Sequence, residues 1–365
     1  MQSKRPNVLF LASWFPNKNH QTVGNFIQRH AELANNVATI YVLFATAVTD
    51  QKERFQIEHS LENNVQITRV YYRRIKHRIP LIHSFLRLKR YQKAMELGAE
   101  SLNQSFDFVH VNTFWFAGIA ALMFQKKMKI SYLITEHWSG FLPQNNAFKS
   151  SSFLMKQLAK RIFKKAKFVL PVSDDLGESL KKNGLISKYI SVPNVINVDL
   201  FSPANTTKSD ICRFIHISTA DEEHKNFSGI LEAFSLVTEE YVLEIITDGD
   251  LVEVEKKINH FNLQKKVTLR GTSKPEEVAQ SLQNADCLVQ FSNVETFSIV
   301  IAEAWSVGIP CIYSKCGGLT NIEDEQLGIQ IEIGNIEALT LSIRSFTKGE
   351  YSFNIINDNL YSRVV

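Results

Sequence analysis

The residues best suited to chemistry lie late in the sequence, where two glutamates stand eight positions apart. Glu295 and Glu303 follow the apolar run Asp286–Phe291. This order predicts that Glu295 lies in a turn after a strand and that Glu303 lies about two turns into the next helix. The start of that helix would offer unpaired backbone amides. They belong to Phe297, Ser298 and Ile299.

A helix start of this kind attracts anions such as phosphate. A carboxylate beside it is better matched to the hydroxyl groups of a sugar, because hydroxyls donate hydrogen bonds to it. A structural alternative stays open, in which Glu295 is a first-turn acid and Glu303 a solvent-facing helix residue. The apolar neighbours of Glu303 favour a buried or cleft-facing carboxylate.

The elements that must hold these residues follow a regular alternation. Short apolar runs rich in β-branched and aromatic residues alternate with amphipathic stretches, which is typical of an α/β fold with parallel strands. Helical stretches such as Asn25–Ala34 and Ser151–Lys164 separate the strands. The strands predicted in the first half are Asn7–Ser13, Val37–Ala45, Val65–Tyr72, Phe108–Asn112, Ser131–Thr135, Phe168–Val172 and Tyr189–Pro193.

The second half repeats the alternation, so two doubly wound, Rossmann-like domains are expected, residues 1–200 and 201–365. The polar stretch Asn197–Asp210 would join them. Ligands of such folds bind at the carboxyl ends of the strands, which predicts a cleft where the two domains face each other. The strands predicted here are Cys212–Ser218, Tyr241–Thr247, Lys266–Arg270, Asp286–Phe291, Pro310–Tyr313 and Gly328–Ile331.

Composition and motifs exclude several classes of protein. With 44% hydrophobic and 21% charged residues, the chain resembles a soluble globular protein. No apolar run reaches the ~20 residues that span a bilayer, and the basic N-terminus lacks a signal-peptide pattern, so a cytoplasmic location is expected. Without a G-x-G-x-x-G, P-loop, H-E-x-x-H or G-x-S-x-G motif, dehydrogenase, kinase, zinc-protease and α/β-hydrolase functions are disfavoured.

The four cysteines stand singly, without the spacing of a zinc site, so reduced structural thiols and no metal are expected. A redox pair of Cys311 and Cys316 is the alternative.

Charge is divided unevenly along the chain. Residues 1–190 carry 28 Lys and Arg but 12 Asp and Glu, a net charge of +16, and residues 191–365 carry a net charge of −12. Basic and apolar residues interleave in Arg73–Arg90, which suits an anionic membrane surface. The alternative is a solvated helix with its apolar residues packed inward, namely Ile82, Phe85, Leu86 and Leu88. Nucleic acid is disfavoured, because no helix-turn-helix, zinc-finger or RNP signature accompanies the charge.

The stretch from Glu295 to Glu303 resembles the E-x7-E motif of glycosyltransferase family 4, the retaining nucleotide-sugar transferases with a GT-B fold. Other segments resemble this family in order and spacing and cover nearly the whole chain. They are Phe10–Asn17 with Gly24–Ile27, Thr135–Gly140, Val172–Ser173, Val192–Ile196, Lys225–Asn226, Gly308–Pro310 and Gly317–Gly318.

The resemblance implies roles for the residues of the second half. Lys225, together with the amides of Phe297, Ser298 and Ile299, would neutralise the donor diphosphate. Glu295 would hold the hydroxyls of the transferred sugar, and Glu303 those of the nucleoside ribose. The structural alternative for Lys225 is a solvated residue that opens a helix.

Three further roles fall in the first half. The resemblance places His137 among the catalytic residues, near the donor sugar. Gly24 would let the backbone approach the phosphates or the acceptor closely. Asn194 would lie near the hinge and bind the donor, or would only hold the backbone there. A structural histidine and a turn glycine are the alternatives for His137 and Gly24.

The implied activity is a metal-independent, retaining transfer of a hexose from a nucleotide sugar, which is a co-substrate and leaves no cofactor to bind. The acceptor would be a glycan or a lipid-linked glycan in cell-surface polysaccharide or lipopolysaccharide synthesis, on the inner face of the cell membrane.

Three departures keep other functions open. The segment Ser218–Lys225 has no arginine before the lysine, Ser298 stands where a glycine is common, and little chain follows the predicted helix Ile336–Phe346 for a return helix. A scaffold subunit of GT-B shape without transfer activity is therefore an alternative, and a nucleotide-sugar epimerase or a phosphorylase is a third. The sugar, the nucleotide and the acceptor are not predicted.

Overall fold

The structure is a computed structural model that describes residues 5–204, 210–319 and 327–351. The chain divides into two compact units. Unit 1 comprises residues 1–141 and 146–195, and unit 2 comprises residues 142–145 and 196–365. The predicted boundary after residue 200 falls in the segment that connects the two sheets. Part of the predicted joining stretch (205–209) and the chain end beyond residue 351, where the return helix was in question, lie outside the described residues.

Unit 1 is built on a sheet of seven strands in the order β3-β4-β2-β1-β5-β6-β7 among the described residues. All neighbours are parallel except β3, which pairs antiparallel with β4 at the sheet edge. The strands are β1 (Asn7–Ala12), β2 (Thr39–Val48), β3 (Phe55–Glu62), β4 (Val65–Arg73), β5 (Phe108–Asn112), β6 (Tyr132–Glu136) and β7 (Val169–Pro171).

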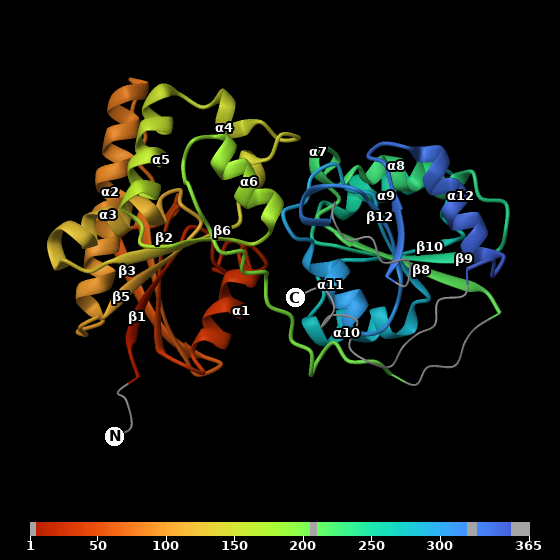
Figure 1. The fold of residues 1–365 in the computed structure, drawn as a ribbon, viewed down its shortest axis with the longest axis horizontal. Coiled ribbons are helices and arrows are strands. Elements are labelled where there is room, and N and C mark those ends of the chain that lie inside the picture. The colour runs from red at the N-terminus through yellow and green to blue at the C-terminus, as the bar shows by residue number, and fades with distance from the viewer. Residues whose placement is uncertain (1–4, 205–209, 320–326, 352–365) are drawn as a thin grey trace. The chain divides into compact units, whose positions relative to one another are not determined.

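Helices cover both faces of this sheet, which confirms the doubly wound arrangement (Figure 1). The contacts of α2 with α3 and of α3 with α5 place these three helices in one layer. Ile27 and Ala31 of α1 belong to a separate core cluster with β1 and β2. The helices are α1 (Asn25–Ala34), α2 (Pro80–Ser101), α3 (Ala117–Met128), α4 (Ala147–Ser150), α5 (Phe153–Lys165) and α6 (Asp174–Lys182).

Local sequence explains where these helices begin, and α6 is the clearest case. The hydroxyl of Ser173 accepts a hydrogen bond from the Leu176 amide at 3.3 Å and so caps the helix. Asp174 and Asp175 occupy the first turn, and two lysines occupy the last turn. This order of charges opposes the helix dipole at both ends, which stabilises the helix.

The basic segment Arg73–Arg90 enters α2, and its first turns are not packed inward. Leu81 is 79% exposed, Phe85 is 58% exposed and Ile82 is 40% exposed. Of the four residues that the alternative packed inward, Ile82 and Phe85 are exposed while Leu86 and Leu88 are partly buried, so the alternative is wrong for the first two. Buried side chains of α2 begin further along the helix, at Tyr91.

Unit 2 contains a second sheet, of six parallel strands in the order β10-β9-β8-β11-β12-β13 among the described residues. The strands are β8 (Cys212–Ser218), β9 (Tyr241–Thr247), β10 (Val267–Arg270), β11 (Cys287–Gln290), β12 (Cys311–Ser314) and β13 (Gly328–Ile331). The helices are α7 (Glu222–Lys225), α8 (Phe227–Ser235), α9 (Leu251–His260), α10 (Pro275–Asn284), α11 (Ile299–Ser306) and α12 (Ile336–Thr347).

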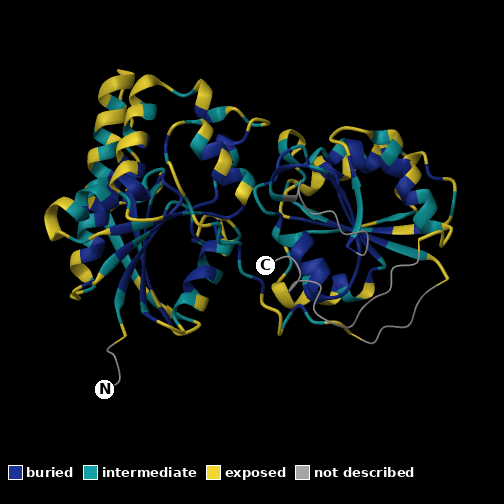
Figure 2. Ribbon diagram, in the orientation of Figure 1, coloured by how far each residue is buried: buried dark blue, intermediate teal, exposed yellow. Residues whose placement is uncertain are grey.

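Two apolar clusters pack against this sheet. One joins α8, α9 and α12, with Phe227 and Phe234 fully buried. The other joins α10 and α11 around Trp305, whose indole N–H donates to the Leu327 carbonyl at 2.8 Å. The strands are covered on both sides (Figure 2), as expected for near-continuous apolar runs.

Two strand predictions were wrong in unit 1. Strand β3 was not predicted, and Tyr189–Pro193 is not a strand. The amides of Ile190 and Val192 do donate to carbonyls of β7, at 3.3 and 2.9 Å. Pro171 has no amide hydrogen to return, so the pairing does not continue as a regular ladder.

All four cysteines are free thiols. The described helices include none that is both long and apolar enough to cross a bilayer.

Candidate functional site

Glu295 lies in the turn between β11 and α11, as predicted. The helix begins only at Ile299, so Glu295 is not a first-turn acid, and that alternative is wrong. The residue is 8% exposed. A carboxylate this deeply buried must be compensated by hydrogen bonds or by a positive charge.

Lys225 supplies the compensating charge. Its ammonium nitrogen lies 2.5 Å from Glu295 Oε1, and the side chain is 23% exposed. The Ser292 hydroxyl donates to the same carboxylate oxygen at 2.8 Å. Lys225 ends α7, where a cation opposes the helix dipole. The alternative of a solvated lysine opening a helix is wrong.

Main-chain hydrogen bonds hold the two charged residues in reach. The amides of Asn293 and Val294 both donate to the carbonyl of His224, at 2.8 and 3.3 Å. The Asn293 side-chain amide also donates to the Glu223 carbonyl, at 3.2 Å. The end of α7 is thereby tied to the turn that carries Glu295.

Gly317, in the segment after β12, lies in close contact with this turn. It has a φ of +55°, and a Cβ at this position would lie 1.4 Å from the Glu295 carbonyl oxygen. Any larger residue would push the Glu295 turn away. The requirement for glycine here is therefore both conformational and steric.

The start of α11 presents backbone amides, as predicted. Among the described residues, nothing accepts a hydrogen bond from the amides of Phe297, Ser298 or Ile299. Ser298 precedes the helix with a φ of +54°, a conformation that explains why glycine suits this position. Its buried hydroxyl also has no hydrogen-bond partner in the described chain.

Glu303 is 5% exposed, so the alternative of a solvent-facing glutamate is wrong. It lies four residues after Ile299, just over one helical turn into α11 instead of the predicted two, because the helix starts later than expected. Its neighbours Ala302 and Ala304 are buried in the core.

Sequence reasoning missed Ser292, which comes directly after the predicted strand and so could have been found from its position. It also missed His216, whose ring bonds the Val289 carbonyl at 2.8 Å and the Ser218 hydroxyl at 2.7 Å. Burial lowers the pKa of His216 to about 4, so the ring is neutral at pH 7. The segment before Lys225, which has no arginine, contains His224. Its ring lies 2.6 Å from an Asp221 carboxylate oxygen.

Unit 1 places His137 directly after β6, at the carboxyl edge of its sheet. The residue is 6% exposed, and neither ring nitrogen has a hydrogen-bond partner of good geometry among the described residues. The rings of Phe26 and His30 lie 4.7 and 5.4 Å from it, between centroids. The side chain of Asn194 nevertheless interacts with this imidazole, since its hydrogen bond opposes the lowering of the His137 pKa by burial.

Glu136 shapes the turn that carries His137, and sequence reasoning missed it. Its carboxylate accepts hydrogen bonds from the amides of His137 at 3.0 Å, Trp138 at 2.9 Å and Phe114 at 3.0 Å. Complete burial nevertheless raises its pKa to about 7. Glu136 is the last residue of the buried strand β6. Its role was missed because the sequence does not show which side chains turn back onto the backbone.

The histidines around this turn are neutral. Burial lowers the pKa of His30 to about 4 and that of His110 to about 3. Burial first, and then the neighbouring His30 and His110, lower the pKa of His137 well below its usual 6.5, while Asn194 acts in the opposite direction.

Gly24 and Asn194 belong to the same unit. Gly24 has a φ of +78°, and a Cβ would lie 2.6 Å from the Trp14 carbonyl group, so its close approach is to the chain's own backbone. Asn194 is buried and its side-chain oxygen lies 3.1 Å from His30 Nε2. The donor-binding roles of both residues remain predictions.

Within unit 2 the structure thus brings together a buried carboxylate, an ammonium group and a helix start. This set can bind an anion beside hydroxyl groups. Within unit 1 it brings together His137, Asn194 and the neutral histidines His30 and His110. Gly24 lies at the start of α1.

Comparison with known families agrees with this arrangement. Residues 204–362 match the family model described as glycosyl transferases group 1, and residues 27–200 match the model described as glycosyltransferase family 4. The class of protein is a glycosyltransferase of the GT-B type. The two matches span most of the chain, which belongs to glycosyltransferase family 4.

Individual relatives are distant. The lipopolysaccharide 1,6-galactosyltransferase of Salmonella typhimurium is 28% identical over 158 residues, which cover 41% of this chain and 44% of the relative. The chain thus matches less than half the length of that relative.

Solved structures match almost the whole chain. Sucrose-phosphate synthase from Thermosynechococcus elongatus superposes with a TM-score of 0.74 at 19% identity, over 99% of this chain and 94% of the other. HepE of Anabaena, in complex with UDP and glucose, gives a TM-score of 0.73 at 14% identity, over 99% and 95%. These likenesses show the GT-B fold.

Replacing Gly317 by alanine should destabilise unit 2 more than the same change at Gly334. Both glycines have positive φ, at +55° and +76°, but only Gly317 faces a backbone atom within 4 Å. Gly334→Ala should cost about 1 kcal/mol for the left-handed conformation alone. Gly317→Ala should cost at least twice that, measured by urea unfolding. Equal losses in the two variants would contradict the packing role of Gly317.

The stability of the protein should rise with pH between about 4.5 and 6.5. Unfolded histidines gain a proton below 6.5, whereas the pKa values of His30 and His110 are about 4 and 3 in the fold, and that of His137 is also low. Their contribution is full above 6.5 and is lost as pH falls. Glu136 acts oppositely, because its raised pKa stabilises the fold at low pH and this contribution is lost as pH rises through about 7.

His216 has a pKa lowered to about 4 as well, so four histidines outweigh one glutamate and the free energy of unfolding should fall by roughly 3–5 kcal/mol from pH 6.5 to 5. Urea titrations at several pH values measure this. Glu136→Gln should steepen the dependence, while the exposed Glu100→Gln should leave it unchanged. A free energy of unfolding that does not fall from pH 6.5 to 5 in the natural chain would contradict the lowered pKa values of the histidines.

Proposed function

We propose that the protein is a retaining glycosyltransferase that moves a hexose from a nucleotide sugar to a glycan or lipid-linked acceptor in cell-surface polysaccharide or lipopolysaccharide synthesis. The observation that carries the proposal is the contact of Lys225 with Glu295, two residues before the free amides of Phe297–Ile299. The UDP and glucose bound to HepE support a nucleotide-sugar donor, and the Salmonella relative supports a lipopolysaccharide product.

In this proposal the donor replaces the ion pair. The diphosphate takes the Lys225 ammonium and the amides at the start of α11, which stabilise the negative charge that develops on the leaving phosphate. Glu295 then accepts hydrogen bonds from hydroxyls of the transferred sugar, and Glu303 from those of the ribose. Lys225 and Glu295, which neutralise each other in the structure, then contact the diphosphate and the sugar of the donor respectively.

Retention follows if the acceptor hydroxyl attacks the face from which the phosphate leaves, and the phosphate takes the hydroxyl proton. No step of this scheme needs a metal ion. Unit 1 has the acceptor role, with His137 at the carboxyl edge where ligands of such sheets bind. The imidazole is neutral at pH 7 and can therefore both donate and accept a hydrogen bond to position a hydroxyl.

The alternative is a scaffold subunit that binds a nucleotide sugar but does not transfer it. It is favoured by the segment before Lys225, where His224 is engaged with Asp221 and no arginine adds charge for the diphosphate. Binding without turnover would support this alternative.

Replacing Glu295 by glutamine should separate nucleotide binding from turnover. Thermal shifts with UDP-, GDP-, ADP-, dTDP- and CMP-linked sugars identify the donor, because a ligand at 100 times its Kd stabilises the fold by about 2.7 kcal/mol. Glu295→Gln should bind the free nucleoside diphosphate at least as tightly as the natural chain, since Lys225 is released from its partner. Donor hydrolysis should fall about 100-fold.

The control is Glu223→Gln, an exposed glutamate on the same short helix, which should change neither quantity. Lys225→Gln should weaken nucleotide binding about tenfold or more. Failure of every nucleotide sugar to stabilise the natural chain would remove the proposal.

We further propose that unit 1 docks on an anionic membrane. Helices that connect parallel strands run opposite to them, so α2 and α5 both begin at the carboxyl edge of the sheet (Figure 1). Besides the exposed residues of α2, Phe153 and Leu154 at the start of α5 are 71% and 74% exposed. Arg73, Arg74 and Lys76 precede α2 and are exposed as well. Apolar side chains among basic ones fit the boundary between lipid headgroups and acyl chains.

Neutralising Arg73, Arg74 and Lys76 to glutamine should weaken binding to phosphatidylglycerol-containing vesicles about 100-fold, since each of the three charges contributes about 1 kcal/mol. Co-sedimentation measures the binding. Phe153→Ser with Leu154→Ser should weaken it too, whereas glutamine at Lys256, Lys265 and Lys274 of unit 2 should not. Equal retention on pure phosphatidylcholine vesicles would contradict the electrostatic part of the proposal.

A further inference from the structure

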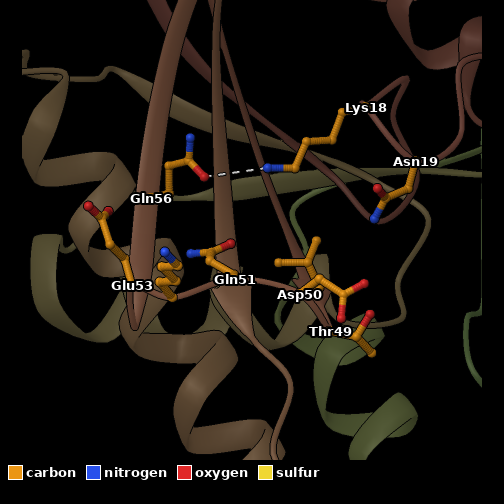
Figure 3. A pocket seen from close by; sticks show the side chains of 9 residues that line it. Lys18, Asn19, Thr49, Asp50, Gln51, Glu53 and Gln56 are labelled. Carbon is orange, nitrogen blue, oxygen red and sulfur yellow. Dashed lines mark hydrogen bonds between the residues drawn. The ribbon is translucent and has the colours of Figure 1, made fainter.

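A polar pocket of about 350 Å³ opens in unit 1, apart from the His137 turn (Figure 3). Its walls come from three segments, which are the loop after β1, the loop after β2 and the start of β3. The lining residues are Lys18, Asn19, Val48, Thr49, Asp50, Gln51, Lys52, Glu53 and Gln56.

The pocket lies at the edge of the sheet where ligands of such folds bind. Lys18 and Asn19 belong to the loop that follows β1, and residues 49–54 follow β2. Because β1 and β2 are parallel neighbours, the loops after them meet at the carboxyl edge of the sheet.

Tyr71 of β4 holds the three segments in place. The Lys18 ammonium lies 3.9 Å from the centre of its ring, and the Lys18 amide donates to its hydroxyl oxygen at 3.4 Å. Gln51 donates from its side-chain amide to the Tyr71 carbonyl at 3.1 Å. Gln56 is the partner of Tyr71 in the β3–β4 register and accepts from Lys18 at 3.4 Å. Tyr71 is 1% exposed, so the pocket stands on a rigid, buried anchor.

The pocket offers both acceptors and donors. The side chains of Thr49, Asp50 and Glu53 are exposed and make no hydrogen bond to the described residues, so a ligand hydroxyl would replace water there. Gln51 Oε1 is buried and also lacks a partner in the described chain. A buried acceptor without a donor is rare in proteins, and a hydroxyl group would satisfy it.

Charge in the pocket is balanced, with Lys18 and Lys52 against Asp50 and Glu53. Two carboxylates disfavour a phosphate, and the mostly polar lining disfavours an acyl chain. A ligand with many hydroxyls, each able to donate and accept, matches the set best. The volume is near the lower end for small-molecule sites, which suits one sugar ring.

We propose that this pocket is a subsite for a sugar residue of the acceptor glycan, an inference that rests on the proposed transferase function. The strand β2 is three places from β6 in the sheet order, so the pocket and the His137 turn are ~14 Å apart along the edge. A sugar bound here is therefore not the one that receives the hexose. The acceptor is then an oligosaccharide whose more distant residue is held by unit 1.

Binding of simple sugars to the full chain tests the subsite. The probes are the methyl glycosides of glucose, galactose, mannose and N-acetylglucosamine, with inorganic phosphate as the charged competitor, measured by ligand-observed NMR. At least one glycoside should bind, and Asp50→Asn and Gln56→Ala should each weaken that binding about tenfold. Phosphate should not compete.

Glu100→Gln and Gln104→Ala are the matched controls, because they make the same kinds of change in exposed residues that precede β5 at the opposite edge. Both should bind like the natural chain, and thermal melts confirm that all variants fold. Glycoside binding that is absent, insensitive to the pocket variants or displaced by phosphate would overturn the subsite.

The same samples separate this inference from the proposed function. Nucleotide-sugar thermal shifts report on unit 2, and the pocket variants should leave them unchanged. Intact nucleotide-sugar binding with no glycoside response defeats the subsite alone, whereas loss of nucleotide-sugar binding in the natural chain defeats the transferase.

Discussion

The ion pair of Lys225 and Glu295 is the constraint on which the edge of unit 2 depends. The two residues are 70 positions apart, yet their charged atoms are 2.5 Å from each other and largely removed from water. Removing charges from water costs several kcal/mol per ion, and the mutual attraction offsets this only when both partners are present and well placed. The hydrogen bonds from Asn293 and Val294 to His224 and the close contact of Gly317 serve that placement.

An ion pair of this kind is a poor device for stability, since apolar residues of similar size often stabilise a fold as well. The same ion pair is well suited to bind a ligand that carries both a negative group and hydroxyls. The negative group of such a ligand binds the lysine, and its hydroxyls donate to the glutamate. The adjoining start of α11 supports this reading, because its amides have no acceptor among the described residues and the dipole there favours an anion.

Much of the fold could be predicted from the sequence, because buried parallel strands appear as apolar runs. Strands β5, β8, β9 and β13 and helix α1 have the predicted bounds. Strand β3 was missed because it is an edge strand, half exposed, with polar residues between its apolar ones. The segment Tyr189–Pro193 was predicted as a strand from its apolar residues, which do not reveal that Pro171 opposite it cannot complete the ladder.

The site was predictable in part for the same reason. The position after a strand identified Glu295, since the loops at that edge are visible as breaks in the apolar pattern, whereas Lys225 and His137 were identified by their resemblance to the family's motifs. The roles of Glu136 and Tyr71 depend on which way a side chain turns within a strand and on the register of its neighbours. Those are tertiary facts, which a single sequence does not contain.

Bulk charge and site charge are arranged independently in this chain, and that separation limits what net charge can say about function. The acidic half, with a net charge of −12, contains the lysine and the amides suited to an anion. The half with a net charge of +16 contains a pocket with balanced charge and a turn of neutral histidines. Neither the pocket nor the histidine turn needs the basic excess of its half. The exposed arginines and lysines before α2 therefore belong to neither site, and their position beside exposed apolar side chains at the starts of α2 and α5 is the observation behind the proposed membrane surface.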